Sequence, residues 1–250
     1  MWKRAFDLIS SVVGLIVLLP LLGLIAIAVL IDGGGPVFYK SYRVGKGGRK
    51  FKMYKFRTMR EGVGDNGPRV TAHDDPRVTS LGKFLRATKI NELPQLLNVL
   101  KGDMSLVGPR PEDPVFVGVY PDEQNTILSV RPGITSPASI LYYDEERLLS
   151  FTKAKDSYVD EIMPRKMRLD LLYVRHHSFL LDMDVLSQTL LYGMPQVRAA
   201  LVPRMDEILF GPVQRMFRKY IPWFVIDWIV GVIAIGASGL IWRFQALPWM

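Results

Sequence analysis

Residues 86–112, RATKINELPQLLNVLKGDMSLVGPRPE, combine cations, carboxylates and amides at a spacing suited to phosphate chemistry. The leucine spacing predicts helices over residues 80–86 and 92–100. Arg86 and Glu92 then fall around the start of the second helix. Unpaired backbone N–H groups and the helix dipole favour anionic phosphate at such a position.

A loop rich in glycine and proline, residues 102–112, closes this segment. Its glycines and prolines fix the backbone, and Arg110 presents a planar fork that can bind two phosphate oxygens at once. A turn with a surface arginine is the plainer alternative. Phosphoryl transfer requires the charge of the diphosphate to be neutralised, normally by Mg²⁺ with Arg and Lys side chains. The two parts together therefore predict a phosphoryl-transfer site.

The block resembles the core motif of the bacterial sugar transferases called monotopic phosphoglycosyl transferases. These enzymes move a phospho-sugar from a nucleotide diphosphate-sugar onto a polyprenyl phosphate. Their motif reads Asp-Glu-Leu-Pro-Gln-Leu, and this chain has Asn91 at the first position. Further stretches resemble the family in the same order: residues 3–32, 34–59, 75–89, 131–135 and, loosely, 170–190. Several motifs in one order argue against chance agreement.

The resemblance implies transfer of a sugar-1-phosphate from a UDP-sugar to undecaprenyl phosphate, which initiates a surface glycan or exopolysaccharide. Mg²⁺ is the implied cofactor, with Glu92 as its carboxylate ligand and Asp103 as a second ligand or a helix-ending cap. The residues assigned to catalysis are Asn91, Glu92, Arg86 and Lys55. Those assigned to substrate phosphates are Arg57, Arg110 and Arg131. Residues 136–143 depart from the family pattern, which leaves the donor sugar open.

Asn91 stands where the family has its nucleophilic aspartate, and a neutral amide oxygen is a far poorer nucleophile than a carboxylate. Three explanations remain open. Glu92 attacks instead, the acceptor phosphate attacks directly, or the chain is a catalytically impaired membrane module that binds nucleotide-sugar or lipid phosphate and recruits later glycan enzymes. Asn91 would also suit an ordinary helix N-cap. The intact cations around it favour a working transferase.

Composition limits the partners of the chain. Its 250 residues are 49% hydrophobic and 22% charged, which suits one catalytic domain plus membrane segments. The net charge of +8 favours anionic partners but does not separate nucleic acid, phosphorylated substrates and acidic lipids. The adjacent membrane segment argues for membrane lipid and against nucleic acid. The absence of cysteine excludes a disulfide framework and a thiolate nucleophile.

Residues 8–31 contain no charged side chain, and about 20 such residues suffice to cross a bilayer as a helix. Pro20 lies near the middle, where it should kink or break the helix. Lys3 and Arg4 precede the segment, and nine basic residues with no acidic one fill residues 40–60. Positive charge at both ends fits cytoplasmic ends on both sides. We therefore expect a re-entrant helix at the inner membrane, with the catalytic domain on the cytoplasmic face.

A basic hairpin should follow, with short strands over residues 37–39 and 51–56 around a turn at 45–48. Lys, Arg and aromatic residues alternate along the second strand, and this alternation predicts that the cations share one face. Such a face beside a membrane segment suits lipid head groups or a lipid phosphate. The resemblance singles out Lys55 and Arg57 as active-site cations.

The sequence predicts a helix-rich α/β membrane-associated domain with four parts. Residues 1–33 form the membrane helix, 34–195 the catalytic domain, 196–220 a basic linker, and 221–250 a second membrane helix, with Asp227 as the single charge in its apolar stretch. That last helix resembles the opening of membrane-bound nucleotide-sugar dehydratases. A fused or associated sugar-modifying enzyme and a homodimer therefore remain open.

Overall fold

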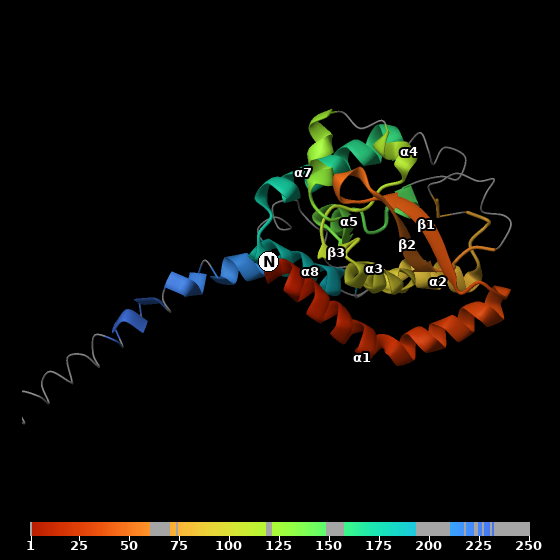
Figure 1. Cartoon of the computed structure of the whole chain (residues 1–250), viewed down its shortest axis with the longest axis horizontal. Helices are drawn as coiled ribbons and strands as arrows, with labels where there is room; N and C mark the ends of the chain where they lie inside the picture. Colours follow the sequence, from red (N-terminus) through yellow and green to blue (C-terminus); the bar gives the residue numbers. More distant parts are fainter. Residues whose placement is uncertain are drawn as a thin grey trace, which may run out of the picture.

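The structure is a computed structural model that describes residues 2–60, 71–73, 75–118, 122–148, 158–193, 211–217 and parts of 219–232. Short helices and two small sheets form a helix-rich α/β domain that lies along one long N-terminal helix (Figure 1). The helix-rich α/β fold predicted from the sequence is confirmed for these residues.

The long helix α1 spans Trp2–Gly33 and contains Pro20. It is continuous but visibly bent near its middle, so that its two arms form a shallow V beneath the domain (Figure 1). Proline removes one backbone donor and crowds the preceding turn, which accounts for the bend. The helix is long and apolar enough to cross a membrane, with a mean hydropathy of 3.0 over an 18-residue window. Many of its apolar side chains, such as Ile16, Val17 and Leu24, are exposed, whereas Ile25 and Val29 are buried.

The N-terminal arm of α1 is held by polar contacts to the domain. Lys3 forms an ion pair with Asp182 in α8 (Phe179–Gly193). The buried carboxylate of Asp7 accepts hydrogen bonds from Ser105 Oγ at 2.8 Å and from the backbone N–H of Leu106 at 3.1 Å. These contacts fix the beginning of the helix to the domain.

The C-terminal arm of α1 is held by Arg57, which follows the hairpin. Its guanidinium donates to the carbonyl oxygens of Val29, Gly34 and Gly35, the last at 2.6 Å. These contacts join the last turn of α1 and the two glycines that follow it to the end of the hairpin. Val29 also packs in an apolar cluster with other buried side chains, namely Ile25, Phe56 and Leu85. Both ends of α1 therefore contact the same domain.

The predicted hairpin is present as β1 (Phe38–Val44) and β2 (Lys50–Phe56), joined at η1 (Lys46–Gly48) and paired antiparallel. The prediction that its cations share one face is wrong. Lys50 and Lys52 are exposed, whereas Lys55 follows the buried positions Phe51 and Met53 on the opposite face. Successive strand residues alternate between faces, so Lys55 points inward.

The helix predicted over residues 80–86 is α2 (Ser80–Ala87), with Thr79 as its N-cap. The predicted second helix is instead a 3₁₀ segment, η2 (Ile90–Gln95), followed by α3 (Leu96–Lys101). The 3₁₀ segment contains Pro94, which has no backbone N–H to donate. In this arrangement Asn98 and Val99 are buried, whereas Leu97 is exposed.

The N-cap interpretation of Asn91 is also wrong. The cap position of η2 is Lys89, which adopts a left-handed conformation with φ 57°. Asn91 lies inside the 3₁₀ segment and is buried.

A short parallel pair of strands, β3 (Ser105–Val107) and β4 (Gly133–Thr135), brings the two Gly- and Pro-containing motifs together. A Cβ atom at Gly133 would lie only 2.1 Å from the backbone nitrogen of Gly108, so glycine is required there. This close approach places the Arg131-Pro132-Gly133 segment directly beside the loop that contains Gly108.

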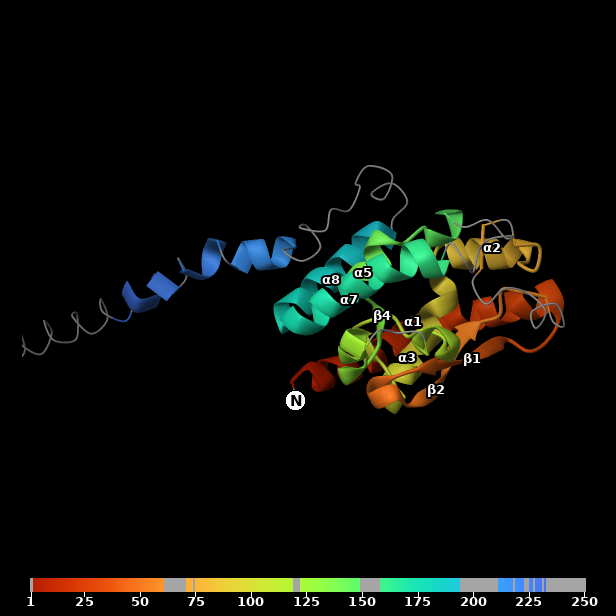
Figure 2. The same ribbon diagram turned by 90° about the horizontal axis from the view of Figure 1, so that it is seen from above.

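The remaining helices are α4 (Pro114–Val117), η3 (Asp122–Ser129), α5 (Pro137–Leu141), η4 (Glu145–Leu148), η6 (Tyr158–Ile162), α7 (Met163–His176) and α8. Of these, α5, α7 and α8 lie together on one side of the domain (Figure 2). Helix α8 also contacts the N-terminal arm of α1. One core cluster joins β3, α5, α7 and α8 through buried side chains that include Val107, Ile140, Tyr173 and Val185.

The predicted basic linker and second membrane helix fall largely outside the described residues. At their described start, Asp184 in α8 accepts hydrogen bonds from the backbone N–H groups of Val213 at 2.7 Å and Gln214 at 3.1 Å. The carboxylate thus caps the helical residues 212–217 from a neighbouring element.

Candidate active site

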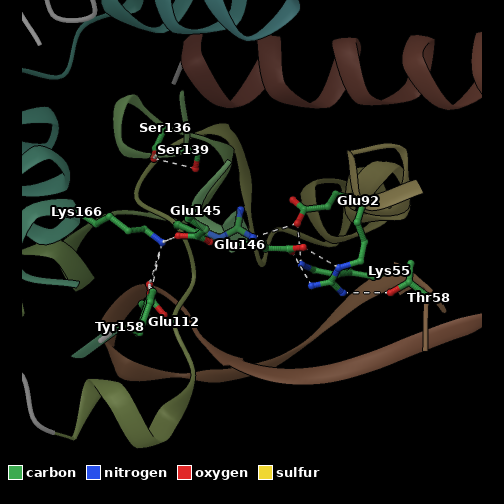
Figure 3. Close-up of polar contacts among 12 residues, drawn as sticks. Lys55, Thr58, Glu92, Glu112, Ser136, Ser139, Glu145, Glu146, Tyr158 and Lys166 are labelled. Carbon is green, nitrogen blue, oxygen red and sulfur yellow. Dashed lines mark hydrogen bonds and ion pairs between the residues drawn. The ribbon is translucent and has the colours of Figure 1, made fainter. Parts of the chain in front are cut away.

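Glu92 lies at the centre of a cluster built by three separate elements. Its Oε1 accepts hydrogen bonds from Lys55 Nζ at 2.7 Å and from Arg110 Nη2 at 3.1 Å. Lys55 comes from β2 and Glu92 from η2 (Figure 3). Arg110 comes from the loop that follows β3. The side chains are 17%, 11% and 25% exposed respectively, so the cluster is largely shielded from water but still reachable.

Electrostatics keep this cluster charged. Burial alone would raise the pKa of Glu92, but Arg110, Lys55 and Lys89 hold that pKa well below its usual range. Glu92 in turn raises the pKa of Arg110 against the effect of burial. Burial lowers the pKa of Lys55 to about 8, although Glu92 opposes the shift. An ionised carboxylate and two cations therefore face one another at neutral pH.

Arg86 lies next to this cluster and is held by a carboxylate of its own. Its Nε and Nη2 donate to Glu146 at 3.2 and 2.7 Å, and its Nη1 donates to Thr58 Oγ1 at 3.2 Å (Figure 3). Thr58 comes shortly after β2, which carries Lys55. The two contacts therefore keep the guanidinium close to the end of that strand.

Asn91 is buried beside Glu92 in η2, and its Oδ1 has no hydrogen-bond partner. A buried polar atom without a partner is costly, which makes such an atom a candidate contact for a ligand. The position expected to carry the nucleophile thus holds a neutral amide oxygen that is available to accept a hydrogen bond or to bind a cation.

Three other predicted site residues make their contacts elsewhere. Arg57 holds the end of α1, as described above. Arg131 Nε donates to the carbonyl of Gly102 at 2.9 Å, at the end of α3. Asp103 accepts a hydrogen bond of 3.4 Å from Asn98 Nδ2. None of these contacts involves Glu92. In the part of the chain that the structure describes, no group of three or more His, Cys, Asp or Glu is placed to hold a metal ion.

Several charged residues near the cluster were not predicted as site residues from the sequence, namely Glu112, Glu145, Glu146 and Lys166. One signal was present for Lys166. It lies on the stripe of α7 formed by buried residues such as Met163, Met167 and Asp170. A lysine on the buried face of an amphipathic helix requires a partner.

Comparison with known proteins identifies the family of the chain. The family model described as bacterial sugar transferase matches residues 1–195, which include every element of the cluster. The chain belongs to the bacterial sugar transferases. The resemblance drawn from the sequence is therefore confirmed at the level of the family.

Three relatives illustrate the family. A Bacillus subtilis protein provisionally named as an undecaprenyl-phosphate N-acetylgalactosaminyl 1-phosphate transferase is 44% identical over 144 residues, covering 58% of this chain and 79% of its own. The UDP-N-acetylgalactosamine-undecaprenyl-phosphate N-acetylgalactosaminephosphotransferase of Aeromonas hydrophila is 35% identical over 75% of this chain. The exopolysaccharide production protein PSS of Rhizobium leguminosarum bv. phaseoli is 36% identical over 75% of this chain.

The lengths of these sugar transferases differ. The matched part covers 92% of the Rhizobium relative but only 42% of the Aeromonas relative. The chain therefore shares the transferase portion with the larger relative, and the remainder of that relative lies outside the match.

Proposed function

We propose that this sugar transferase moves a sugar-1-phosphate from a UDP-sugar to undecaprenyl phosphate and thereby initiates a surface glycan or exopolysaccharide. The observation that carries the proposal is the buried Glu92 carboxylate paired with Lys55 and Arg110. The names of two relatives support the substrates: the Bacillus and Aeromonas names both specify undecaprenyl phosphate, and the Aeromonas name also specifies a UDP-sugar.

In the net reaction, a phosphate oxygen of the acceptor becomes bonded to the β-phosphorus of the UDP-sugar. The bond from that phosphorus to the bridging oxygen breaks, and UMP leaves with the electron pair. Lys55, Arg86 and Arg110 would neutralise the diphosphate and the departing UMP, because fixed cations in a shielded site stabilise the charge that develops there. The ionised Glu92 holds two of these cations in place before substrate arrives.

Mg²⁺ fits the oxygen donors in η2, since Glu92 offers a carboxylate and Asn91 an oxygen without a hydrogen-bond partner. Mg²⁺ typically takes one or two protein carboxylates together with substrate phosphates and water. When bound, the ion would supply Lewis-acid stabilisation of the phosphoryl oxygens. Asp103 contacts Asn98 instead, so we assign the metal to Glu92 and not to Asp103.

Release of UMP tests the function directly. The full chain in detergent should release UMP when supplied with undecaprenyl phosphate, Mg²⁺ and at least one member of a UDP-sugar panel. A related enzyme with Asp-Glu in the motif serves as the positive control. If that enzyme works and this chain releases no UMP with any donor, the alternative of a non-catalytic binding module, which the neutral Asn91 favours, replaces the transferase.

The pH dependence of donor use should report Lys55. Below its pKa of about 8 the side chain is charged and can bind the diphosphate, whereas above this value the charge is lost. We therefore expect kcat/KM for the UDP-sugar, which reports the free enzyme, to fall above pH 8. Lys55→Arg keeps its charge at all these pH values and should move the decline to higher pH. An unchanged alkaline limb in Lys55→Arg would remove Lys55 from donor binding.

We also propose that α1 enters and leaves the inner membrane on the cytoplasmic side. At 1.5 Å per residue the arms on either side of Pro20 are about 27 and 20 Å long, shorter than the hydrocarbon core of about 30 Å. Both ends also contact the same domain. A cysteine introduced at position 2 should react with a membrane-impermeant maleimide only after the inner face is exposed. Labelling in intact cells would establish a spanning helix instead.

A further inference from the structure

Lys166 is a buried cation on α7 that the proposed reaction has not used. Its side chain is 4% exposed. Its Nζ donates to Glu145 Oε2 at 2.8 Å and to Tyr158 Oη at 3.4 Å, and it lies 4.0 Å from Glu112 Oε1 (Figure 3). Tyr158 Oη also donates to Glu112 at 2.6 Å. The ammonium group thus joins two carboxylates from distant parts of the chain.

Both carboxylates are close in sequence to residues of the candidate active site. Glu112 lies two residues after Arg110. Glu145 immediately precedes Glu146, whose carboxylate binds Arg86 through two hydrogen bonds. The two carboxylates that Lys166 contacts are therefore separated by only one or two residues from Arg110 and from Glu146, the partner of Arg86.

Asp170 is a third buried carboxylate on the same face of α7, one turn beyond Lys166. Burial raises the pKa of Asp170 to about 7, and Lys166 opposes this shift. Lys166 therefore acts on Asp170 as well as on Glu145 and Glu112.

The charges show what Lys166 balances. Burial would raise the pKa of Glu145, but Lys166 and then Arg110 hold that pKa below its usual range. Burial together with Glu112 raises the pKa of Tyr158 well above its usual range, so the phenol stays protonated and donates. If Lys166 lost its charge, Arg110 would be the strongest remaining cation acting on Glu145, and it would be drawn from Glu92 toward Glu145.

We propose that Lys166 is a positioning residue that keeps Arg86 and Arg110 available for the diphosphate of the donor by neutralising Glu145 and Glu112 behind them. The proposal rests on the proposed function in taking a nucleoside diphosphate as the ligand. A purely structural ion pair between α7 and η4 is the alternative, and it predicts loss of stability without a specific change in nucleotide affinity.

UDP binding with Mg²⁺ to the full detergent-solubilised chain tests the proposal without requiring turnover. Lys166→Met should raise the Kd for UDP by about tenfold or more, since truncating one partner of a buried charge pair leaves the other charge, here that of Glu145, unpaired. Lys166→Met/Glu145→Gln removes the unpaired carboxylate as well and should recover much of the affinity. Arg165→Met, on the exposed face of the same helix, is the matched control and should bind UDP like the parent.

Thermal unfolding of each variant identifies folded protein. If Lys166→Met does not fold, Lys166→Arg keeps the charge on a longer, planar group and should weaken UDP binding less than tenfold while remaining folded. Parent-like UDP affinity in folded Lys166→Met, or no recovery in the double variant, would overturn the proposal. A parent chain that binds no UDP would overturn it too. A parent that binds UDP but releases no UMP would overturn only the transferase function.

Discussion

Glu92→Gln should lower UMP release by about a hundredfold or more, because it removes the charge around which the candidate active site is organised. Lys55 and Arg110 both donate to the same oxygen of this carboxylate. The amide keeps the shape but offers only one acceptor oxygen and no charge. Without Glu92 the pKa of Lys55 should fall further below about 8, so part of its positive charge is lost at neutral pH.

The same substitution should also destabilise the protein, since removing one partner from a buried ion pair costs about 3–5 kcal/mol. Rates must therefore be compared per folded molecule, with the folded fraction taken from thermal unfolding. Asp103→Asn is the matched control, because it removes a carboxylate in the adjoining segment whose contact is with Asn98. We expect its rate to stay near that of the parent. A parent-like rate in folded Glu92→Gln, or a large loss in Asp103→Asn, would move the metal and the chemistry to other residues.

Local patterns predicted several elements correctly because the deciding forces are local. The Gly-rich turn and flanking alternation predicted the hairpin of β1 and β2. The leucine spacing predicted a helix over residues 80–86, and α2 spans Ser80–Ala87. The apolar run with a central proline predicted a bent helix, and α1 is bent (Figure 1).

Other features depended on contacts between distant segments. Arg57 was expected to bind phosphate, but the carbonyls at the end of α1 lie within its reach. Such a contact depends on where the helix returns to the domain, which residue spacing does not specify. The inward face of Lys55 could have been inferred from strict alternation with Phe51 and Met53. The assumption that all basic residues of the strand share one face was therefore the source of the error.

The pairs formed by Glu145, Glu146 and Lys166 were the least predictable part of the site. Glu146 is 60 residues from its partner Arg86, and Glu145 is 21 residues from Lys166. No local periodicity relates residues at such separations. The only sequence signal was a lysine on the buried stripe of α7, which indicates that a partner exists without identifying it.

The position of Asn91 makes a sharper test of the chemistry. Its Oδ1 is buried and has no hydrogen-bond partner, so Asn91→Asp replaces an isosteric neutral oxygen by a carboxylate. The neighbouring Glu92 would raise the pKa of this new group, whereas the nearby cations would lower it. Lys55, Lys89 and Arg110 all act on Glu92 in the adjacent position. With three cations against one carboxylate, we expect the aspartate to be ionised at neutral pH and able to act as a nucleophile.

Asn91→Asp should therefore raise UMP release by about tenfold or more, since a carboxylate is a much better nucleophile than an amide. Its oxygen would bond to the β-phosphorus of the donor while UMP leaves, giving a covalent phospho-sugar adduct visible by intact mass when acceptor is omitted. Asn125→Asp, on an exposed position, is the matched control and should form no adduct. The parent should form none unless Glu92 attacks, in which case the adduct should map to Glu92 and vanish in Glu92→Gln. An active parent without an adduct, together with an Asn91→Asp variant that also forms none and turns over no faster, would instead mean that the acceptor phosphate attacks the donor directly.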